Sequence, residues 1–307
     1  MSISIRKMIP ADRAAVGELI TLSTNVWYQT HGFGKIFPGD PALTRFHFDV
    51  YHTLPGSCGF VAVDDDTNFI IGSCFMHVRP THVGLGIMNV HPSHANRKVA
   101  SLLLQTIIGE AETLKKPLRL VSSAMNLDSF SLYNRAGLKV HEVYQDMILT
   151  VPADGVLTDR GDGSCRDATF DDLDAIVELE REVAGIERPG DYRHFIANGN
   201  GNWHISVRPG RDGRLDGVLV SCLHPAARMV GPGIARDGAS AYQLLLAELP
   251  QHRGNHAVYL VPVRETDLVA RLYRLGARNC ELHFAQILGG RGTFNGVSLP
   301  SFMPESN

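Results

Sequence analysis

The sequence lacks the features that mark membrane, secreted and nucleic-acid-binding proteins. No apolar run approaches the roughly 20 residues that a membrane-spanning helix needs, and the opening residues MSISIRKMIPADR lack the apolar centre of a signal peptide. The formal net charge is only −3, from 29 basic and 32 acidic residues. We therefore expect neither a membrane nor a nucleic acid as partner, because no excess of positive charge would attract either surface.

Cysteine is scarce and irregularly spaced. The chain has 5 cysteines, an odd number, and none of them forms a C-x-x-C pair. They are Cys58, Cys74, Cys165, Cys222 and Cys280. This pattern argues against a disulfide framework and against a zinc site, so we expect no metal and predict reduced thiols in a cytoplasmic protein.

The glycine signature of dinucleotide-binding folds is also missing. No G-x-G-x-x-G follows the first predicted strand, around Ile3 and Ile5, and no acidic residue stands at the expected distance beyond it. Both are needed in a dinucleotide-binding βαβ unit, because the glycines admit the pyrophosphate and the acid binds the ribose. The sequence therefore argues against that class of enzyme.

The length of 307 residues is typical of about two domains, and the chain does contain an internal repeat. The segment from Cys165 aligns with that from Ile5, and the segment from Val230 aligns with that from Asn89. A Gly- and Asp-rich stretch, 152–164, separates the two copies and is predicted to be a linker. We therefore predict a first domain over 1–151, a second over 165–290 and a loop-like tail over 291–307.

Hydrophobic periodicity predicts alternating strands and helices in the first copy. An irregular stretch rich in aromatic residues, Asn25 to Pro41, is interpreted either as a packed loop or as one wall of a substrate cleft around Trp27 to Phe37. The predicted strands are 3–5, 59–63, 69–77, 85–90, 118–122 and 140–151, and the predicted helices are 10–23, 43–53, 99–107 and 127–136.

The stretch from Ile87 to Ile107 is the most informative part of the chain. An apolar strand end is followed by Pro92, by a polar turn, and by a helix with an apolar stripe. A turn that enters a helix offers unpaired N–H groups and the positive end of the helix dipole, which together bind anions such as phosphate. Arg97 and Lys98 add positive charge there, although an ordinary strand-to-helix turn would look the same.

Two motifs in this region resemble those of the GNAT (Gcn5-related) N-acetyltransferase family. The acetyl-CoA motif V-x-P-x-x-[RQ]-G-x-G-x-[GA] is matched by Val90, Pro92 and Ala100. Ala95 replaces its Arg or Gln, and Asn96 and Lys98 replace its first two glycines. The motif N-x-x-[AS]-x-x-[LF]-Y-x-x-x-G-[FL] is matched in full register, by Asn126, Ser129, Leu132, Tyr133, Gly137 and Leu138.

The resemblance implies a tandem GNAT protein of α/β (α+β) class, with two mixed, mostly antiparallel sheets flanked by helices. It implies an acyltransferase that moves an acetyl group from acetyl-CoA to a primary amine, by direct attack in a ternary complex. Tyr133 would be the general acid near the thioester sulfur, and a backbone N–H near Asn89 and Val90 on a splayed strand would contact the thioester carbonyl. The cofactor-binding residues implied are Asn89, Val90, Ala95, Asn96, Arg97, Lys98, Val99, Ala100, Ser101, Asn126, Ser129 and Tyr133.

The second copy departs further from these motifs. Its segment Val230–Ala235 is interpreted as a glycine-containing turn, Thr266 stands in place of Asn126, and either Tyr273 or Leu272 takes the place of Tyr133. We therefore interpret the second copy as non-catalytic.

The sequence leaves the general base, the acceptor and the oligomeric state open. His77, His82 and His91 are candidate bases, and a water relay is an equal alternative. The acceptor is expected to be a small molecule. The alternative function is a non-catalytic protein that binds an acyl-CoA or an amine, which the missing glycines favour.

Overall fold

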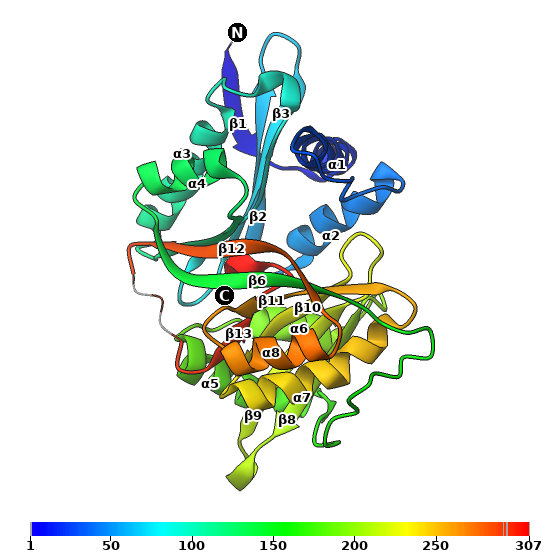
Figure 1. Ribbon diagram of the computed structural model, residues 1–307. Helices are drawn as coiled ribbons and strands as arrows, with labels where there is room; N and C mark the ends of the chain where they lie inside the picture. Colours follow the sequence, from blue (N-terminus) through cyan, green and yellow to red (C-terminus); the bar gives the residue numbers. More distant parts are fainter. Residues whose placement is uncertain (1, 291, 293, 307) are drawn as a thin grey trace. The chain divides into compact units, whose positions relative to one another are not determined.

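The computed structural model describes residues 2–290, 292 and 294–306 of the chain. It contains two compact units, Met1–Leu118 and Arg119–Asn307, and each is described by itself below. Both consist of a mostly antiparallel sheet flanked by helices, so the predicted mixed α/β class is confirmed (Figure 1). None of the helices among the described residues is long and apolar enough to cross a membrane.

The first unit is a four-stranded antiparallel meander with helices on both faces. Its strands are β1 (Ile3–Lys7), β2 (Ser57–Asp64), β3 (Phe69–Val78) and β4 (Val83–Val90), which lie in that order. Its helices are α1 (Arg13–Thr30), α2 (Arg45–Thr53) and α3 (Val99–Thr113), with 3-10 turns at Pro10–Asp12, Pro41–Thr44 and Pro92–His94. Figure 1 shows α1 and α2 on one face of this sheet and α3 on the other.

Helix α1 is longer than predicted, so the expected irregular stretch begins too early. It continues to Thr30 and includes Trp27 and Tyr28. The Thr30 hydroxyl donates to the Val26 carbonyl at 2.8 Å, and the His31 ring stacks on Trp27 at 4.1 Å, which supports the last turn. The helix ends before Gly32, whose φ of +86° favours glycine.

The second unit has one long sheet. Its strands lie in the order β5, β12, β6, β11, β10, β9, β8 and β7, and β13 pairs with β10. Strands β10 and β11 pair in parallel, with Met229 opposite Val258. The strands are β5 (Leu118–Ser123), β6 (Lys139–Thr150), β7 (Arg166–Asp167), β8 (Trp203–Pro209), β9 (Leu215–Cys222), β10 (Met229–Ala235), β11 (His256–Pro262), β12 (Arg278–Leu288) and β13 (Val297–Leu299).

The helices of this unit cover its apolar strands. They are α4 (Leu127–Arg135), α5 (Leu173–Ala184), α6 (Pro189–Ala197), α7 (Gly238–Glu248) and α8 (Thr266–Arg274), with 3-10 turns at Phe170–Asp172, Arg211–Gly213, Leu249–His252 and Pro304–Ser306. The main core lies around α7, where Leu244, Leu245 and Leu249 have no exposed surface and pack with Tyr259 and Val261 of β11. This apolar contact holds the second half of α7 on the sheet.

Both copies of the repeat carry the same capped ion pair. Arg6 donates to both carboxylate oxygens of Asp12, at 2.7 and 2.9 Å, and Arg166 donates to those of Asp172 at 2.8 and 2.7 Å. In each copy the aspartate also accepts from the backbone N–H three residues earlier, at 2.9 Å. The alignment of Arg6 with Arg166 and of Asp12 with Asp172 therefore has a structural basis.

The compact units do not divide where the repeat does. Strand β6 pairs with β11 along one edge and with β12 along the other, so residues 139–150 are bonded on both sides to strands that follow the linker. The division therefore falls at Leu118/Arg119 and not after residue 151. The assignment of 1–151 and 165–290 as two repeats stays a proposal.

The tail differs from the predicted loop. Residues Val297–Leu299 form β13, a buried strand, because each of them packs into the core and the backbone pairs with β10. Of the apolar side chains of the tail, Leu299 and Phe302 are buried, at 0% and 3% exposure, and Phe294 is half-buried. Residues 291, 293 and 307 of the predicted tail lie outside the described part of the chain.

Candidate functional site

The loop between β4 and α3, residues 91–98, adopts the backbone conformation that the acetyl-CoA motif assigns to glycine. Asn96 and Lys98 both have φ of +63°, in the left-handed region. L-residues other than glycine rarely adopt this region, because Cβ crowds the following carbonyl, and asparagine tolerates it better than lysine. The loop thus has glycine-like geometry at the two motif positions where the sequence has replaced glycine.

Helix α3 begins with its first backbone donors uncapped. Lys98 is its N-cap residue, and no side chain accepts a hydrogen bond from the N-terminal N–H groups. The first four N–H groups of an α-helix have no partner within the helix, so those of Val99, Ala100 and Ser101 are available to an anion. The side chains of Ala95, Arg97 and Lys98 are exposed beside them, whereas Val99 is buried and anchors the turn.

The histidines of the loop have structural roles. His91 Nδ1 accepts from the Ser93 N–H at 3.2 Å and lies 2.7 Å from Ser93 Oγ, and His94 Nε2 lies 3.7 Å from an Asp64 carboxylate oxygen. These contacts hold the turn Pro92–His94 on the end of β4. His91 therefore braces the loop.

The other two candidate bases are buried inside the first unit. His77 has no exposed surface, and its Nδ1 lies 2.7 Å from Ser57 Oγ and 3.0 Å from Arg79 Nη2. His82 also has no exposed surface, and its Nδ1 lies 3.0 Å from Thr81 Oγ1. Neither imidazole ring is therefore accessible from solution to the amine that would accept the acetyl group.

A cavity of about 860 Å³ lies in the first unit next to this loop. Residues of α1 and β3 form most of its wall, and His91, Ser93 and His94 also line it. The stretch Asn25 to Pro41 contributes Asn25, Val26, Gln29, Lys35 and Pro41 to the lining, and none of its aromatic side chains. Trp27 and Tyr28 pack against each other instead, with ring centroids 5.0 Å apart.

The second motif forms the start of helix α4. Asn126 is the N-cap, and its Oδ1 accepts from the Ser129 N–H at 3.0 Å. Tyr133 lies two turns further on the same face and is 6% exposed. Gly137, with φ of +92°, ends the helix.

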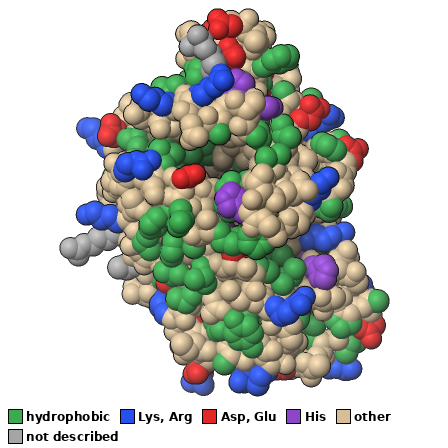
Figure 2. Space-filling view, turned by 45° about the horizontal axis from the view of Figure 1, so that its top comes forward, with side chains coloured by type: hydrophobic (Ala, Val, Ile, Leu, Met, Phe, Trp, Pro, Cys, Tyr) green, Lys and Arg blue, Asp and Glu red, His purple; other side chains and the backbone are tan. Residues whose placement is uncertain are grey.

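The predicted site residues therefore fall into two groups. Residues Asn89 to Ser101 belong to the β4–α3 segment of the first unit, and Asn126, Ser129 and Tyr133 lie together on α4 of the second unit. The Asn89 side chain binds within the first unit, where Nδ2 donates to Ser23 Oγ at 2.6 Å, and its buried Oδ1 has no hydrogen-bond partner among the described residues. Figure 2 shows Lys and Arg side chains scattered among acidic and apolar ones on the face in view.

The second copy has no counterpart of the β4–α3 loop, which corrects the sequence-based interpretation. Residues Val230–Ala235 are part of strand β10 and not a turn, and only Arg236 and Asp237 connect β10 to α7. The glycines serve close packing, since a Cβ on Gly233 would lie 2.3 Å from Leu219 Cδ1. Asp237 Oδ1 accepts from the Ser240 N–H at 2.7 Å, so a carboxylate already caps this helix start.

The register of the last helix in the second copy is also settled. The N–H of Leu138 donates to the Tyr133 carbonyl, and the N–H of Ala277 donates to the Leu272 carbonyl, both at 3.1 Å. Leu272, with no exposed surface, is thus the counterpart of Tyr133, and Tyr273 points outward with 47% exposure. Glu265, and not Thr266, is the N-cap that corresponds to Asn126.

Sequence reasoning missed a group of titratable side chains on β6 and β12. Asp146 lies directly opposite Glu281, and His283 has Nδ1 3.8 Å from Asp146 Oδ2 and Nε2 3.2 Å from Glu281 Oε1. Ser123 Oγ, at the end of β5, donates to Glu281 Oε2 at 2.8 Å. The donor atoms of Asp146, Glu281 and His283 lie within 4.8 Å of one another, close enough to coordinate one cation.

The electrostatics of this group favour proton exchange near neutral pH. Burial, and then the neighbouring Glu281 carboxylate, raise the pKa of Asp146 to about 7. Burial lowers the pKa of His283. Among the described residues, Asp146 Oδ1 and His283 Nδ1 have no hydrogen-bond partner. No sequence signal could have found the group, because its members are far apart in the chain and meet only through the β6–β12 pairing.

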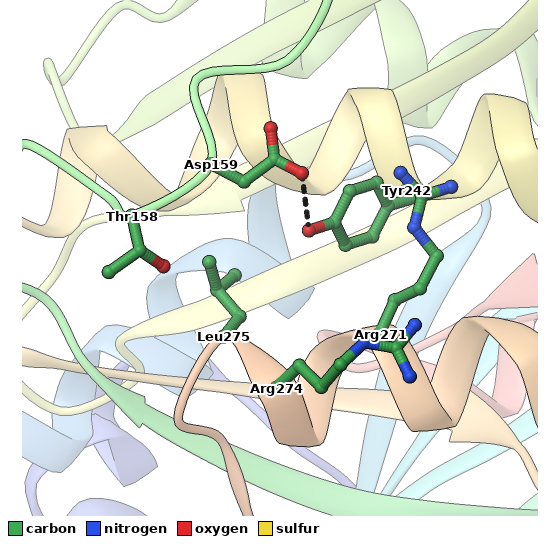
Figure 3. Close-up of a pocket in the computed structure, with 6 residues that line it drawn as sticks. All are labelled: Thr158, Asp159, Tyr242, Arg271, Arg274 and Leu275. Carbon is green, nitrogen blue, oxygen red and sulfur yellow. Dashed lines mark hydrogen bonds between the residues drawn. The ribbon is translucent and has the colours of Figure 1, made fainter.

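A smaller pocket, of about 280 Å³, lies where the predicted linker packs on the second copy (Figure 3). The Tyr242 hydroxyl donates to Asp159 Oδ2 at 3.0 Å, and Arg271 lies over the Tyr242 ring at 3.6 Å. Arg274, Thr158 and Leu275 complete its wall. The contacts attach the linker to α7 and α8, so this segment is a packed part of the second unit.

Comparison with known proteins finds one family model that matches part of the chain. Residues 25–138 match the model of the Acetyltransferase (GNAT) family, and this range contains both motifs. The predicted resemblance to the GNAT family is confirmed. No curated protein matches the chain.

Solved structures share the fold of the whole chain. A candidate acetyltransferase from Pyrococcus horikoshii matches with a TM-score of 0.74 and 12% identity, over 99% of this chain and 95% of that one. A GCN5-related N-acetyltransferase from Sphaerobacter thermophilus matches with a TM-score of 0.63 and 14% identity, over 97% and 98%. A tandem GNAT protein from the clavulanic acid biosynthesis pathway matches with a TM-score of 0.63 and 12% identity, over 94% and 99%. The tandem GNAT fold predicted from the repeat is therefore confirmed.

Proposed function

We propose that the protein is an N-acetyltransferase that moves an acetyl group from acetyl-CoA to the primary amine of a small molecule. One observation carries the proposal: the GNAT match spans a loop whose Asn96 and Lys98 have glycine-like φ values and a helix with Asn126 and Tyr133 in register. Non-glycine residues with positive φ cost conformational energy, and such residues cluster at active sites and ligand sites. We therefore take the loop conformation as support for a binding role.

The β4–α3 loop would hold the pyrophosphate of acetyl-CoA. The Ala95 N–H already donates to the Pro92 carbonyl at 3.2 Å and shapes the turn. The uncapped N–H groups of Val99, Ala100 and Ser101 would supply donors, and the exposed Arg97 and Lys98 side chains would supply positive charge. These groups fit a diphosphate, because they combine a helix dipole with cations and carry no carboxylate cap. The backbone near Asn89 and Val90 would contact the thioester carbonyl, and Asn126 and Ser129 would contact the cofactor from α4.

Tyr133 would act as general acid. The amine nitrogen forms a bond to the thioester carbonyl carbon, the carbon–sulfur bond breaks, and the leaving thiolate takes the phenolic proton of Tyr133. The buried position of Tyr133 on a packed helix holds its hydroxyl in one place, and a positioned donor is what this step requires.

The group on β6 and β12 is our candidate for the proton acceptor, which the sequence left open. The acceptor's ammonium group must lose a proton before its nitrogen can attack, and a carboxyl group with a pKa of about 7, such as Asp146, is half deprotonated at neutral pH. The Ser123–Glu281 hydrogen bond joins this group to the end of β5, three residues before Asn126, on the unit that carries Tyr133. Asp146 and His283 would therefore take the proton directly or through a water.

A regulatory protein that binds an acyl-CoA or an amine without turnover remains the second candidate. The observation that favours it is the replacement of both motif glycines, since the side chains of Asn96 and Lys98 limit how closely a pyrophosphate approaches the backbone.

The proposal is tested by a calorimetric titration of acetyl-CoA into the full chain, followed by a screen of small amines. We expect one equivalent to bind the wild type and none to bind Lys98→Glu. Lys115→Glu is the matched control, because Lys115 lies beyond the other end of α3, about 22 Å away at 1.5 Å per residue. Binding without turnover of any amine would favour the regulatory reading, and no binding would refute the acetyltransferase.

A further inference from the structure

The tail of the chain enters the sheet of the second unit between two strands. Strand β13 pairs antiparallel with β10, with Leu299 opposite Gly233 and Val297 opposite Ala235. Just beyond β13, Ser301 Oγ accepts from the Leu260 N–H of β11 at 2.7 Å. The tail is thus hydrogen-bonded to β10 and also to its neighbour β11.

The position that the tail fills is an opening between β10 and β11. These parallel strands are in register only at Met229 and Val258, and they diverge beyond that pair. Val297, Ser298 and Leu299 have at most 1% of their surface exposed, so they fill the opening completely and belong to the core.

Two glycines make room for this segment. A Cβ added to Gly231 would lie 2.6 Å from the Leu299 carbonyl oxygen and 2.6 Å from the Ser301 nitrogen. A Cβ added to Gly296 would lie 2.4 Å from the Ala235 carbonyl oxygen. The backbone of the tail therefore touches β10 without an intervening side chain, and no ligand could lie between them.

Both ends of the segment are fastened. Before β13, Arg264 Nη2 donates to the Gly296 carbonyl at 2.6 Å and the Asn295 N–H donates to the Val183 carbonyl at 2.7 Å. After it, the Phe302 ring packs against Trp203, with centroids 5.1 Å apart. Burial of each such apolar side chain stabilises the fold by about 1.5–3 kcal/mol, so the tail has the anchorage of a core strand.

Strand β10 is the counterpart of β4, because each is the strand that precedes the helix of the phosphate motif in its copy. We propose that β13 permanently occupies the opening beside β10 where the second copy would otherwise receive an acyl chain, so that the chain binds a single acyl-CoA. This inference rests on the proposed function. The short Arg236–Asp237 connection and the Asp237 cap support it independently, since they leave no anion site at the start of α7.

Hydrogen exchange of the full chain, followed by mass spectrometry, tests the inference. In the free chain we expect the amides of Ser298, Leu299 and Leu260 to exchange as slowly as those of β10. On addition of saturating acetyl-CoA we expect new protection in residues 89–101 and no change in β10, β11 or β13. Fast exchange at Ser298 and Leu299 in the free chain would overturn the inference whether or not acetyl-CoA binds, so it is separable from failure of the proposed function.

Stoichiometry gives a second and independent readout. We expect the wild type to bind one equivalent of acetyl-CoA in calorimetry and Lys98→Glu to bind none. Two equivalents in the wild type, or protection of residues 229–240 by acetyl-CoA in Lys98→Glu, would show that the tail leaves the second opening accessible. Ser301→Ala should accelerate exchange of the Leu260 amide alone, and Gly199→Ala, at a site with nothing within 4 Å, should leave it unchanged.

Discussion

Leu272 occupies in the second copy the helical position that Tyr133 occupies in the first. In both, the residue's carbonyl accepts from the N–H five positions later at 3.1 Å, next to a glycine of positive φ. The two side chains are buried alike, at 0% and 6% exposure, but only the tyrosine has a proton to donate. The difference confines the proposed proton donor to the first copy.

Tyr133→Phe is therefore expected to lower kcat by about 10²–10⁴-fold, because a general acid contributes on that scale. The affinity for acetyl-CoA should change little, because phenylalanine keeps the buried aromatic ring of Tyr133. Tyr273→Phe is the matched control, because it removes an exposed hydroxyl that donates to Gln145 at 2.9 Å. Steady-state rates with the best amine of the screen and calorimetry for the cofactor give both quantities, and equal rates for Tyr133→Phe and the wild type would exclude the acid role.

Lys98→Gly is expected to raise the free energy of unfolding by about 0.5–1 kcal/mol, because glycine adopts a φ of +63° without steric cost. Lys98→Ala keeps that cost and should not stabilise the protein. Both variants lose the ammonium group and should weaken acetyl-CoA binding equally.

Lys115 provides the control for this pair, since it also has a positive φ, of 55°, outside the loop. Lys115→Gly should stabilise the chain by a similar amount and leave acetyl-CoA binding unchanged. Urea denaturation measures stability and calorimetry measures affinity. Weaker binding in Lys98→Ala than in Lys98→Gly would show that the backbone conformation contributes to the site beyond the charge.

The sequence predicted those parts of the fold that depend on local patterns. Strand alternation located β2, β3 and β4, and Gly137 marked the end of α4, because both signals lie in neighbouring residues. The repeat was visible in Arg6–Asp12 and Arg166–Asp172, since each pair is local to its turn. The prediction ended α1 too early, at residue 23, although no glycine or proline stands between that residue and Gly32.

The features that the sequence could not provide all depend on contacts between distant segments. The glycines near Gly231 resemble a phosphate turn in the sequence, but Gly231 makes room for β13, which is more than 60 residues away, and Gly233 packs against Leu219 of β9. Asp146 and Glu281 become neighbours only when β12 pairs with β6. A single sequence contains no local signal for either pairing.

Asp12→Asn and Asp172→Asn should each lower the free energy of unfolding by about 1–2 kcal/mol, because each aspartate is a helix-start cap that also binds an arginine. The arginine hydrogen bonds lower the pKa of Asp12 and of Asp172 below its ordinary value of 3.8. A carboxyl group whose pKa is lower in the folded state stabilises the fold at any pH above its unfolded-state pKa. This stabilisation is lost as the pH falls through the folded-state pKa. The loss on mutation should therefore be complete at pH 7 and shrink below pH 4, which denaturation at pH 7 and pH 3 measures. An unchanged loss at pH 3 would contradict the ion-pair explanation.

Asp146→Asn is expected to raise the free energy of unfolding and to lower the activity. The folded chain holds a proton on Asp146 between its unfolded pKa of 3.8 and its folded pKa of about 7, so its contribution to the free energy of unfolding falls as pH rises through this range. Asparagine fits the site and never ionises. The variant should therefore be more stable than the wild type at pH 8, by about 1–3 kcal/mol, and similar to it at pH 4.

The same substitution removes the proposed proton acceptor. In the wild type, kcat/KM should rise with pH around 7, because only the carboxylate form of Asp146 accepts a proton, and Asp146→Asn should lose this step in the profile. Asp128→Asn is the control, an exposed carboxyl group in the first turn of α4. If the variant gains stability at pH 8 but keeps the wild-type pH–rate profile, Asp146 destabilises the fold without serving the reaction. The proton acceptor would then be a water relay. If Asp146→Asn loses the pH-dependent step in kcat/KM and also gains stability, then Asp146 lowers the stability of the fold and serves the reaction.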